Sequence, residues 1–121
     1  MIRIPYGRLE FRLPDSGCNP YLVHAALIAA GLDGVERELD PGEAQNINLY
    51  ELSEEERKKA GIDILPQHLS EALDALEADT VLVERLGKEI VSEFLKVKRE
   101  EWIEYSRHVS SWEVKQYAEF F

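Results

Sequence analysis

Arg8-Leu9-Glu10-Phe11-Arg12 is the stretch that decides how the rest of this 121-residue chain is arranged. Side chains on a β-strand alternate between its two faces, so the three charged residues share one face and the two apolar residues share the other. A carboxylate between two guanidiniums suits a site that holds a divalent cation beside anionic oxygens. The same pattern also describes a solvated strand face whose charges compensate one another. For an isolated Arg-x-Glu-x-Arg, that second interpretation is the commoner one.

Several longer segments resemble the glutamine synthetase family. The resemblance begins with RLEFRLPDSGCNPYLVHAALIAAGLDG at residues 8–34 and continues, in the family's order, with DPGE at 40–43, NLYEL at 48–52 and LSEALDALEAD at 69–79. The last stretch, EWIEYSRHVSSWEVKQYAEFF at 101–121, resembles the γ-glutamylmethylamide synthetase branch of that family. The resemblance covers nearly the whole chain. It implies a carboxy-terminal fragment of the glutamine synthetase catalytic α+β domain.

The chemistry that this resemblance implies is ATP-dependent amide synthesis in nitrogen metabolism, for glutamine biosynthesis or its methylamide counterpart. In the family, ATP phosphorylates the side-chain carboxylate of glutamate, and ammonia or methylamine then displaces phosphate from the acyl phosphate. Phosphoryl transfer depends on metal ions and cationic side chains that neutralise the developing charge. The implied cofactors of a complete enzyme are ATP with Mg²⁺ or Mn²⁺. The sequence leaves ammonia and methylamine open as the acceptor.

Four residues receive roles from the resemblance, position by position. Glu10 is the expected carboxylate ligand to a catalytic divalent cation, and Arg8 is expected to face the ATP phosphates. Arg12 is expected to face the substrate carboxylate or the phosphoryl group in transfer. Tyr50 falls where some bacterial members carry a tyrosine that is adenylylated, so it is a candidate modification site. An ordinary loop tyrosine is the alternative for this last residue.

The other walls of a family-like site are expected from sequence preceding Arg8. One glutamate cannot replace the further carboxylates, the nucleotide pocket and the flap of such a site, so we expect the 121-residue chain to be inactive in isolation. The alternative is a non-catalytic interaction module that associates with intact synthetase subunits through its aromatic helices. Both interpretations predict self-association or binding to other synthetase subunits.

Composition limits the classes of partner. The chain has 24 acidic and 14 basic residues, a formal net charge of −10, and this argues against nucleic acid or an anionic membrane surface as a partner. Cys18 is the only cysteine, so no intrachain disulfide can form, and a reducing cytoplasmic setting is the simplest inference. No apolar run has the length needed to cross a bilayer.

The patterning along the chain predicts a mainly α fold with one or two amino-terminal β-strands in a single domain over residues 1–121. Asn19 followed by Pro20 predicts a helix start, and Ser53 with Glu56 and Ser110 with Glu113 match capping boxes. Residues 1–5 are expected to be an extended lead-in. The expected elements are a strand over about 6–13 and helices over about 20–33, 54–60, 69–86, 88–108 and 111–119.

Overall fold

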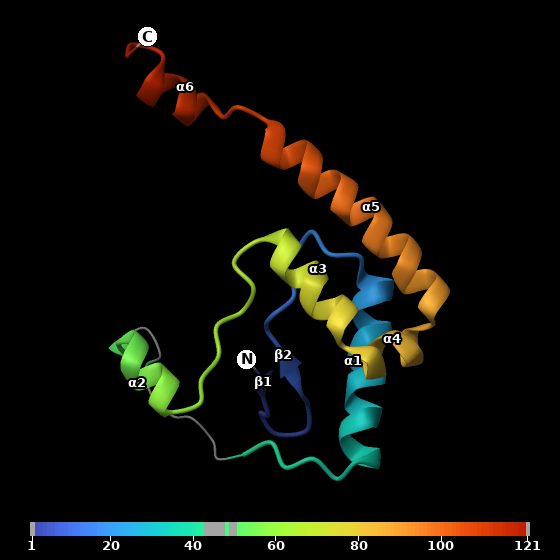
Figure 1. The fold of residues 1–121 in the computed structure, drawn as a ribbon. Coiled ribbons are helices and arrows are strands. Elements are labelled where there is room, and N and C mark those ends of the chain that lie inside the picture. The colour runs from blue at the N-terminus through green and yellow to red at the C-terminus, as the bar shows by residue number, and fades with distance from the viewer. Residues whose placement is uncertain (1, 43–47, 49–50, 121) are drawn as a thin grey trace. The chain divides into compact units, whose positions relative to one another are not determined.

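The computed structural model describes residues 2–42, 48 and 51–120, and Figure 1 shows its elements. Helices dominate the described residues, with one two-stranded sheet near the amino terminus, which confirms the mainly α fold class. The chain divides into two compact units, and the single domain expected over residues 1–121 stays a prediction. The amino-terminal unit comprises residues 1–40 and the carboxy-terminal unit residues 41–121. Each unit has its own internal packing and is described separately below.

The amino-terminal unit opens with a small antiparallel sheet. Strand β1 (Ile2–Arg3) pairs with strand β2 (Glu10–Phe11), in a register that sets Ile2 opposite Phe11 and Arg3 opposite Glu10. The connection turns back at Gly7, whose φ of 78° lies in the left-handed region that glycine adopts without strain. Within the lead-in expected over residues 1–5, Ile2–Arg3 therefore form a strand, and the strand expected over residues 6–13 is restricted to Glu10–Phe11.

Helix α1 (Pro20–Glu36) completes this unit. Its start follows the sequence prediction, because the Asn19 side chain accepts hydrogen bonds from the backbone N–H groups of Tyr21 at 3.0 Å and Leu22 at 3.3 Å. The helix runs three residues beyond the expected end at 33. An i,i+4 ion pair between Arg37 and Asp33, at 3.1 Å, lies over its last turn.

The described part of the carboxy-terminal unit contains five helices. They are α2 (Glu54–Lys59), α3 (Leu69–Ala78), α4 (Thr80–Leu86), α5 (Lys88–Arg107) and α6 (Ser111–Tyr117). The bounds of α2, α5 and α6 lie within two residues of those expected, inside the ordinary scatter of helix ends. Both predicted capping boxes are present, at Ser53 with Glu56 and at Ser110 with Glu113.

The single helix expected over residues 69–86 is two helices, because Asp79 interrupts it. The backbone N–H of Asp79 closes α3 on the carbonyls of Ala75 and Leu76. Its side chain accepts from the backbone N–H of Leu82 at 2.9 Å and so caps the start of α4. The apolar pattern continues through this joint, which is why periodicity alone predicted one helix.

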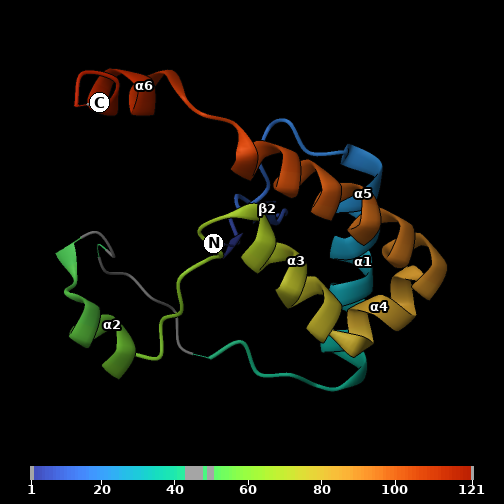
Figure 2. The same ribbon diagram turned by 45° about the horizontal axis from the view of Figure 1, so that its top comes forward.

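Helices α3, α4 and α5 pack together. The chain reverses at Gly87, whose φ is 96°, and α5 then runs back along α3, as Figures 1 and 2 show. Leu73 of α3 and Val91 of α5 are only 2% and 4% exposed and form the core between these helices. At one end of the packed pair, the His68 ring stacks on Trp102 with ring centroids 5.0 Å apart.

Membrane insertion through a helix finds no support in the described residues. None of the helices that the structure describes combines the length and the apolar character that a bilayer span requires.

Leu73→Ala is expected to destabilise the carboxy-terminal unit by about 2–5 kcal/mol, because it leaves a cavity in the contact between α3 and α5. Urea unfolding followed by tryptophan fluorescence measures this loss. Ile90→Ala is the control, because Ile90 lies on α5 but is 58% exposed, and it is expected to cost less than about 1 kcal/mol. Equal losses for the two variants would contradict the assignment of the core.

The capping box of α6 makes this helix sensitive to acid. Hydrogen bonds from the Ser110 backbone N–H and hydroxyl lower the pKa of Glu113 below its ordinary value. The stabilisation is therefore complete above the ordinary pKa of glutamate and is lost as the pH falls through the lowered pKa. Ser110→Ala removes the hydroxyl and keeps the backbone N–H, so we expect the Glu113 midpoint in a carboxyl-carbon NMR titration to rise part of the way toward its ordinary range. Ser111→Ala, one residue along, is the control and should leave the midpoint low.

Candidate functional site

Arg8 lies two residues before Glu10, the first residue of strand β2, and the two side chains are in contact. The Arg8 side chain donates from Nη2 at 2.8 Å and from Nε at 3.2 Å to the same carboxylate oxygen, Oε1 of Glu10. The two side chains are 66% and 30% exposed, so the pair lies at the surface of the amino-terminal unit. The geometry confirms that residues 8 and 10 share a face. It does not test the roles that the resemblance implies for them.

Arg3 is a third member of this group that the sequence interpretation missed. It lies opposite Glu10 in the β1–β2 ladder, and its Nη1 is 3.7 Å from the second carboxylate oxygen, Oε2. Glu10 therefore has one arginine on each of its oxygens. A signal was present in the sequence, because Ile2-Arg3-Ile4 alternates apolar and charged residues as a half-buried strand does.

Arg12 takes part in none of the ion pairs of this group. Arg12 is exposed, and among the residues that the structure describes it has no ion-pair partner. The side chain is therefore free to meet an anion supplied from outside. Tyr50 lies outside the described residues, so its candidacy as a modification site stays a prediction.

The charge balance of this group favours anions. Two arginines, Arg3 and Arg8, and one carboxylate give this group a local positive charge in a chain whose formal net charge is −10. Arginine forks match the oxygens of phosphates and carboxylates, and a charge-assisted pair is stronger than a neutral hydrogen bond. The group is therefore suited to an anionic oxygen cluster rather than to a cation alone.

A divalent cation does not fit this chain by itself. Over residues 2–42, 48 and 51–120, no three His, Cys, Asp or Glu residues gather closely enough to hold a metal ion. Mg²⁺ and Mn²⁺ take six ligands, and one carboxylate already paired with two arginines supplies too few. Any cation bound through Glu10 needs its other ligands from outside these residues.

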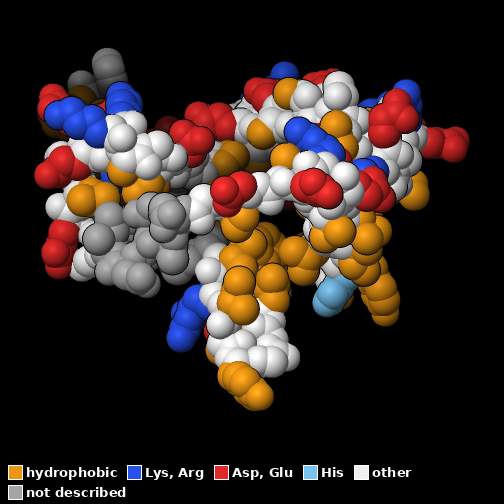
Figure 3. Space-filling view, turned by 90° about the horizontal axis from the view of Figure 1, so that it is seen from below, with side chains coloured by type: hydrophobic (Ala, Val, Ile, Leu, Met, Phe, Trp, Pro, Cys, Tyr) orange, Lys and Arg blue, Asp and Glu red, His pale blue; other side chains and the backbone are white. Residues whose placement is uncertain are grey.

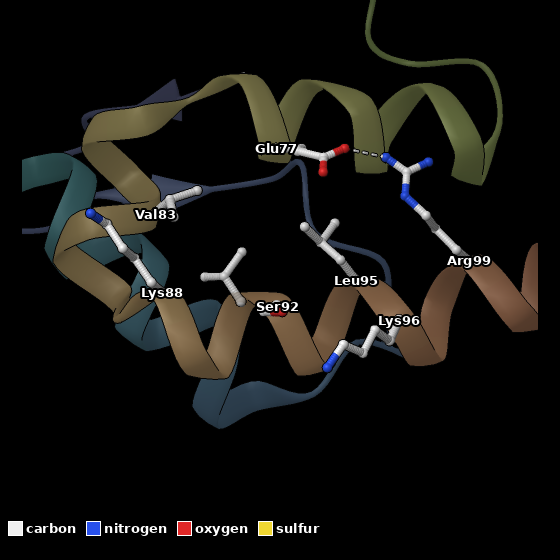
Figure 4. A pocket seen from close by; sticks show the side chains of 8 residues that line it. Glu77, Val83, Lys88, Ser92, Leu95, Lys96 and Arg99 are labelled. Atoms are coloured by element: carbon white, nitrogen blue, oxygen red, sulfur yellow. Dashed lines mark hydrogen bonds and ion pairs between the residues drawn. The ribbon is translucent and has the colours of Figure 1, made fainter.

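The carboxy-terminal unit contains a groove between α3, α4 and α5. This groove has a volume of about 320 Å³, and Figure 4 shows the side chains around it. Its lining residues are Glu77, Val83, Lys88, Val91, Ser92, Leu95, Lys96 and Arg99.

The arginine and lysine side chains that line this groove form ion pairs with acidic residues of the same unit. Arg99 on α5 donates to Asp74 at 2.8 Å and to Glu77 at 2.6 Å on α3, and Figure 4 shows the pair with Glu77. These hydrogen bonds, the one to Asp74 first, raise the pKa of Arg99 further above its ordinary value. Lys88 pairs with Glu84, and Lys96 pairs with Glu93. The groove is thus a packing feature of this unit, and the hairpin remains the candidate site.

Comparison with known proteins places this geometry in a family. The family model described as "Glutamine synthetase, catalytic domain" matches residues 1–117. This range contains both strands, the Arg3, Arg8 and Glu10 group, and all six helices that the structure describes.

Individual relatives agree with this match. The chain is 61% identical over 121 residues to a glutamate–methylamine ligase of Methyloversatilis universalis and covers 100% of itself but 27% of that protein. It is 46% identical over 126 aligned residues to a glutamine synthetase of Halobacterium salinarum, covering 100% and 28%. A solved structure titled "Apo GmaS without ligand" matches with a TM-score of 0.80 and 42% identity, over 98% of this chain and 27% of that one. The chain thus spans little more than a quarter of the length of these relatives.

ATP with Mg²⁺ is expected to bind the 121-residue chain weakly, because the hairpin offers arginines but no second metal-ligating group nearby. In an NMR titration, small shifts should appear at residues 3, 8, 10 and 12. The β1–β2 amides should keep their line widths at stoichiometric nucleotide. Tight, saturating binding at a 1:1 ratio would show that this chain holds a complete nucleotide site.

Proposed function

We propose that this chain, which belongs to the glutamine synthetase family of catalytic domains, is the carboxy-terminal part of an ATP-dependent ligase that joins glutamate to an amine. The observation that carries the proposal is the arrangement of Arg3, Arg8 and Glu10 on one face of the β1–β2 hairpin, inside the segment that matches the family. The proposal therefore concerns a part of a site, not a whole one.

Each side chain has a role that its chemistry supports. The guanidinium of Arg8 would bind nucleotide phosphate oxygens, and its bidentate geometry matches them. Arg12, exposed and free of ion pairs among the described residues, would bind the substrate carboxylate or the transferring phosphoryl group. Glu10 would supply one carboxylate to a cation whose other ligands come from outside the described residues.

Arginines contribute to such a reaction by neutralising charge. When a phosphoryl group moves from ATP to a carboxylate, negative charge spreads over its oxygens, and fixed cations stabilise that state more than the ground state. Arg3 and Arg8 are already held against Glu10, so they need little reorganisation to face an anion. In the complete enzyme, ATP and Mg²⁺ or Mn²⁺ would be the cofactors.

Sequence similarity supports methylamine as the amine to test first. The glutamate–methylamine ligase is 61% identical to this chain, and the glutamine synthetases of Halobacterium salinarum and Methanocaldococcus jannaschii are 46% and 43% identical. Ammonia remains the second candidate. A ligase that consumes ATP, with a single cysteine in this segment, fits a reducing cytoplasmic setting.

The isolated chain is proposed to be inactive, because its hairpin carries one carboxylate and the described residues contain no cluster that could hold a metal. A non-catalytic role as an interaction module is the alternative. The exposed aromatic residues of the carboxy-terminal segment favour it, since Trp112 is 61% and Phe120 78% exposed. A module of this kind would bind intact synthetase subunits without restoring any activity.

A single-chain chimera tests the proposed function. Residues 1–121 replace the matching segment of the Methyloversatilis ligase, and ATP-dependent amide formation is measured with methylamine and with ammonia. We expect an active chimera, and a loss of about 100-fold or more with Glu10→Gln or Arg12→Ala, because each removes a group that stabilises transition-state charge.

Glu100→Gln is the matched control for this experiment. Glu100 is an exposed glutamate on α5, away from the hairpin in sequence, and its loss should leave the rate unchanged. A correctly folded chimera without activity, or a Glu10→Gln chimera as active as its parent, would contradict the proposed roles. An inactive chimera together with tight binding of the 121-residue chain to intact ligase would favour the interaction module.

A further inference from the structure

The side chain that caps the start of α3 is a histidine, whereas serines cap α2 and α6. Nδ1 of His68 accepts a hydrogen bond from the backbone N–H of Glu71 over 3.3 Å, the contact that the serine hydroxyl makes in each capping box. A serine hydroxyl does not change its charge near neutral pH, but a histidine side chain does so between about pH 5 and 8. Helix α3 therefore begins at a cap that protonation can alter.

The Glu71 carboxylate contacts the other nitrogen of the same ring. Its Oε1 lies 3.2 Å from Nε2 of His68, and its Oε2 accepts a hydrogen bond from the backbone N–H of Gln67 at 2.7 Å. One neutral tautomer satisfies both contacts of the imidazole, with the proton on Nε2 and the lone pair on Nδ1, and we assign it from these partners. The neutral ring therefore donates to the carboxylate and accepts from the backbone of Glu71 at the same time.

Helix α5 contacts the flat face of this ring. His68 stacks on Trp102 with ring centroids 5.0 Å apart and an angle of 16° between the ring planes. The His68 side chain is 43% exposed, so a proton can reach it without any unfolding. A cation over the face of a tryptophan is attracted by the electrons of the indole ring. Protonation of His68 therefore strengthens its contact with Trp102 and removes the lone pair of Nδ1 in the same step.

The cations near this ring pair have acidic partners of their own. On α5, Lys98 and Arg99 lie one turn before Trp102, and Tyr105 packs on Trp102 from one turn after it, with ring centroids 5.7 Å apart. The acidic partners of the two cations are Glu101, Asp74 and Glu77. Basic and acidic side chains also lie next to one another on the face of the molecule that Figure 3 shows. Glu71 is therefore the charged group that acts most directly on the His68 ring.

We propose that His68 is a pH-sensitive cap, which holds the first turn of α3 when neutral and releases it when protonated. With a proton on each ring nitrogen, the imidazolium has no acceptor left, and the backbone N–H of Glu71 loses its partner. The ring keeps its ion pair with Glu71 and its stack on Trp102, so the packing of α3 against α5 is preserved. The first turn opens instead, starting with the hydrogen bond from the Ala72 N–H to the His68 carbonyl, at 3.2 Å. Acid thus loosens the connection that leads into α3 without separating the two helices.

NMR of the 121-residue chain between about pH 8 and 5.5 tests this cap, in a range that stops above the ordinary titration of carboxylates. The carbon-bound ring protons of His68 report its protonation. The hydrogen-exchange rate of the Glu71 amide, divided by the rate of an unstructured amide at the same pH, reports the cap. We expect the protection of this amide to fall about threefold or more as the ring is protonated, the effect of losing one helix cap. The upfield shift that the Trp102 ring current gives to the His68 ring protons should persist.

Two substitutions and one internal reference isolate the effect of His68. His68→Asn keeps a neutral acceptor at the cap, so the protection of the Glu71 amide should be the same at both ends of the pH range. His108→Asn, at the end of α5, is the matched control and should leave the fall in protection unchanged. The Glu56 amide, capped by Ser53, is the internal reference. Hydrogen bonds from the Ser53 side chain and backbone lower the pKa of the Glu56 carboxyl, so that capping box stays intact throughout.

Each contrary outcome overturns a stated part of the inference. Equal protection of the Glu71 amide with the His68 ring neutral and protonated would show that the cap survives protonation. A fall of the same size in His68→Asn would assign the effect to another group. Loss of the ring-current shift on protonation would show that the ring leaves Trp102, and a ring that does not titrate in this range would exclude the switch. None of these results depends on the proposed function, because the cap lies in α3 and the candidate site lies in the β1–β2 hairpin.

Discussion

The cross-strand pair of Arg3 and Glu10 is the constraint on which the interpretation of this chain depends. Antiparallel pairing sets these two residues opposite each other, and Ile2 opposite Phe11 on the other face. Because side chains alternate along a strand, the register sorts the hairpin into a charged face and an apolar face. A slip of one residue would place Arg3 and Glu10 on opposite faces and break that pair, whereas Arg8 and Glu10 lie on the same segment of chain and would stay together. Local pairing therefore determines both the candidate site and the apolar face of the hairpin.

The two units differ in how they are stabilised. In the carboxy-terminal unit, Leu73 and Val91 are buried, and Arg99 joins α5 to two carboxylates of α3. In the amino-terminal unit, Ala29 is the only buried residue in the part that the structure describes, although this unit holds the candidate catalytic residues. Burial of apolar area is the main favourable term in folding. The unit with the candidate site residues is therefore the one with less buried apolar area to stabilise it.

Features set by near neighbours in sequence were predictable, and features set by distant ones were not. The Asn19 cap and both capping boxes require partners two or three residues away, and they form as expected. Strand β1 was missed because its hydrogen-bonding partner lies at Glu10–Phe11, and nothing within residues 1–5 reveals that pairing. The break at Asp79 was missed because the apolar pattern continues through it. The candidate site shows the same difference. Strand alternation predicted that Arg8 and Glu10 share a face, but Arg3 joins them only through the pairing of β1 with β2.

Solvent exposure determines what the arginines can do in the chain alone. At 66% exposure for Arg8, its pair with Glu10 is worth at most about 1 kcal/mol, because water screens both charges. Because this ion pair is weak, it breaks at a small cost in free energy. Glu10 can then bind a cation, and the arginines can bind phosphate oxygens. Covering the hairpin would lower the local dielectric and strengthen each of these contacts. The same side chains would then bind a substrate more tightly. No new charge is needed, because the surrounding protein would exclude water from the charges that are already present.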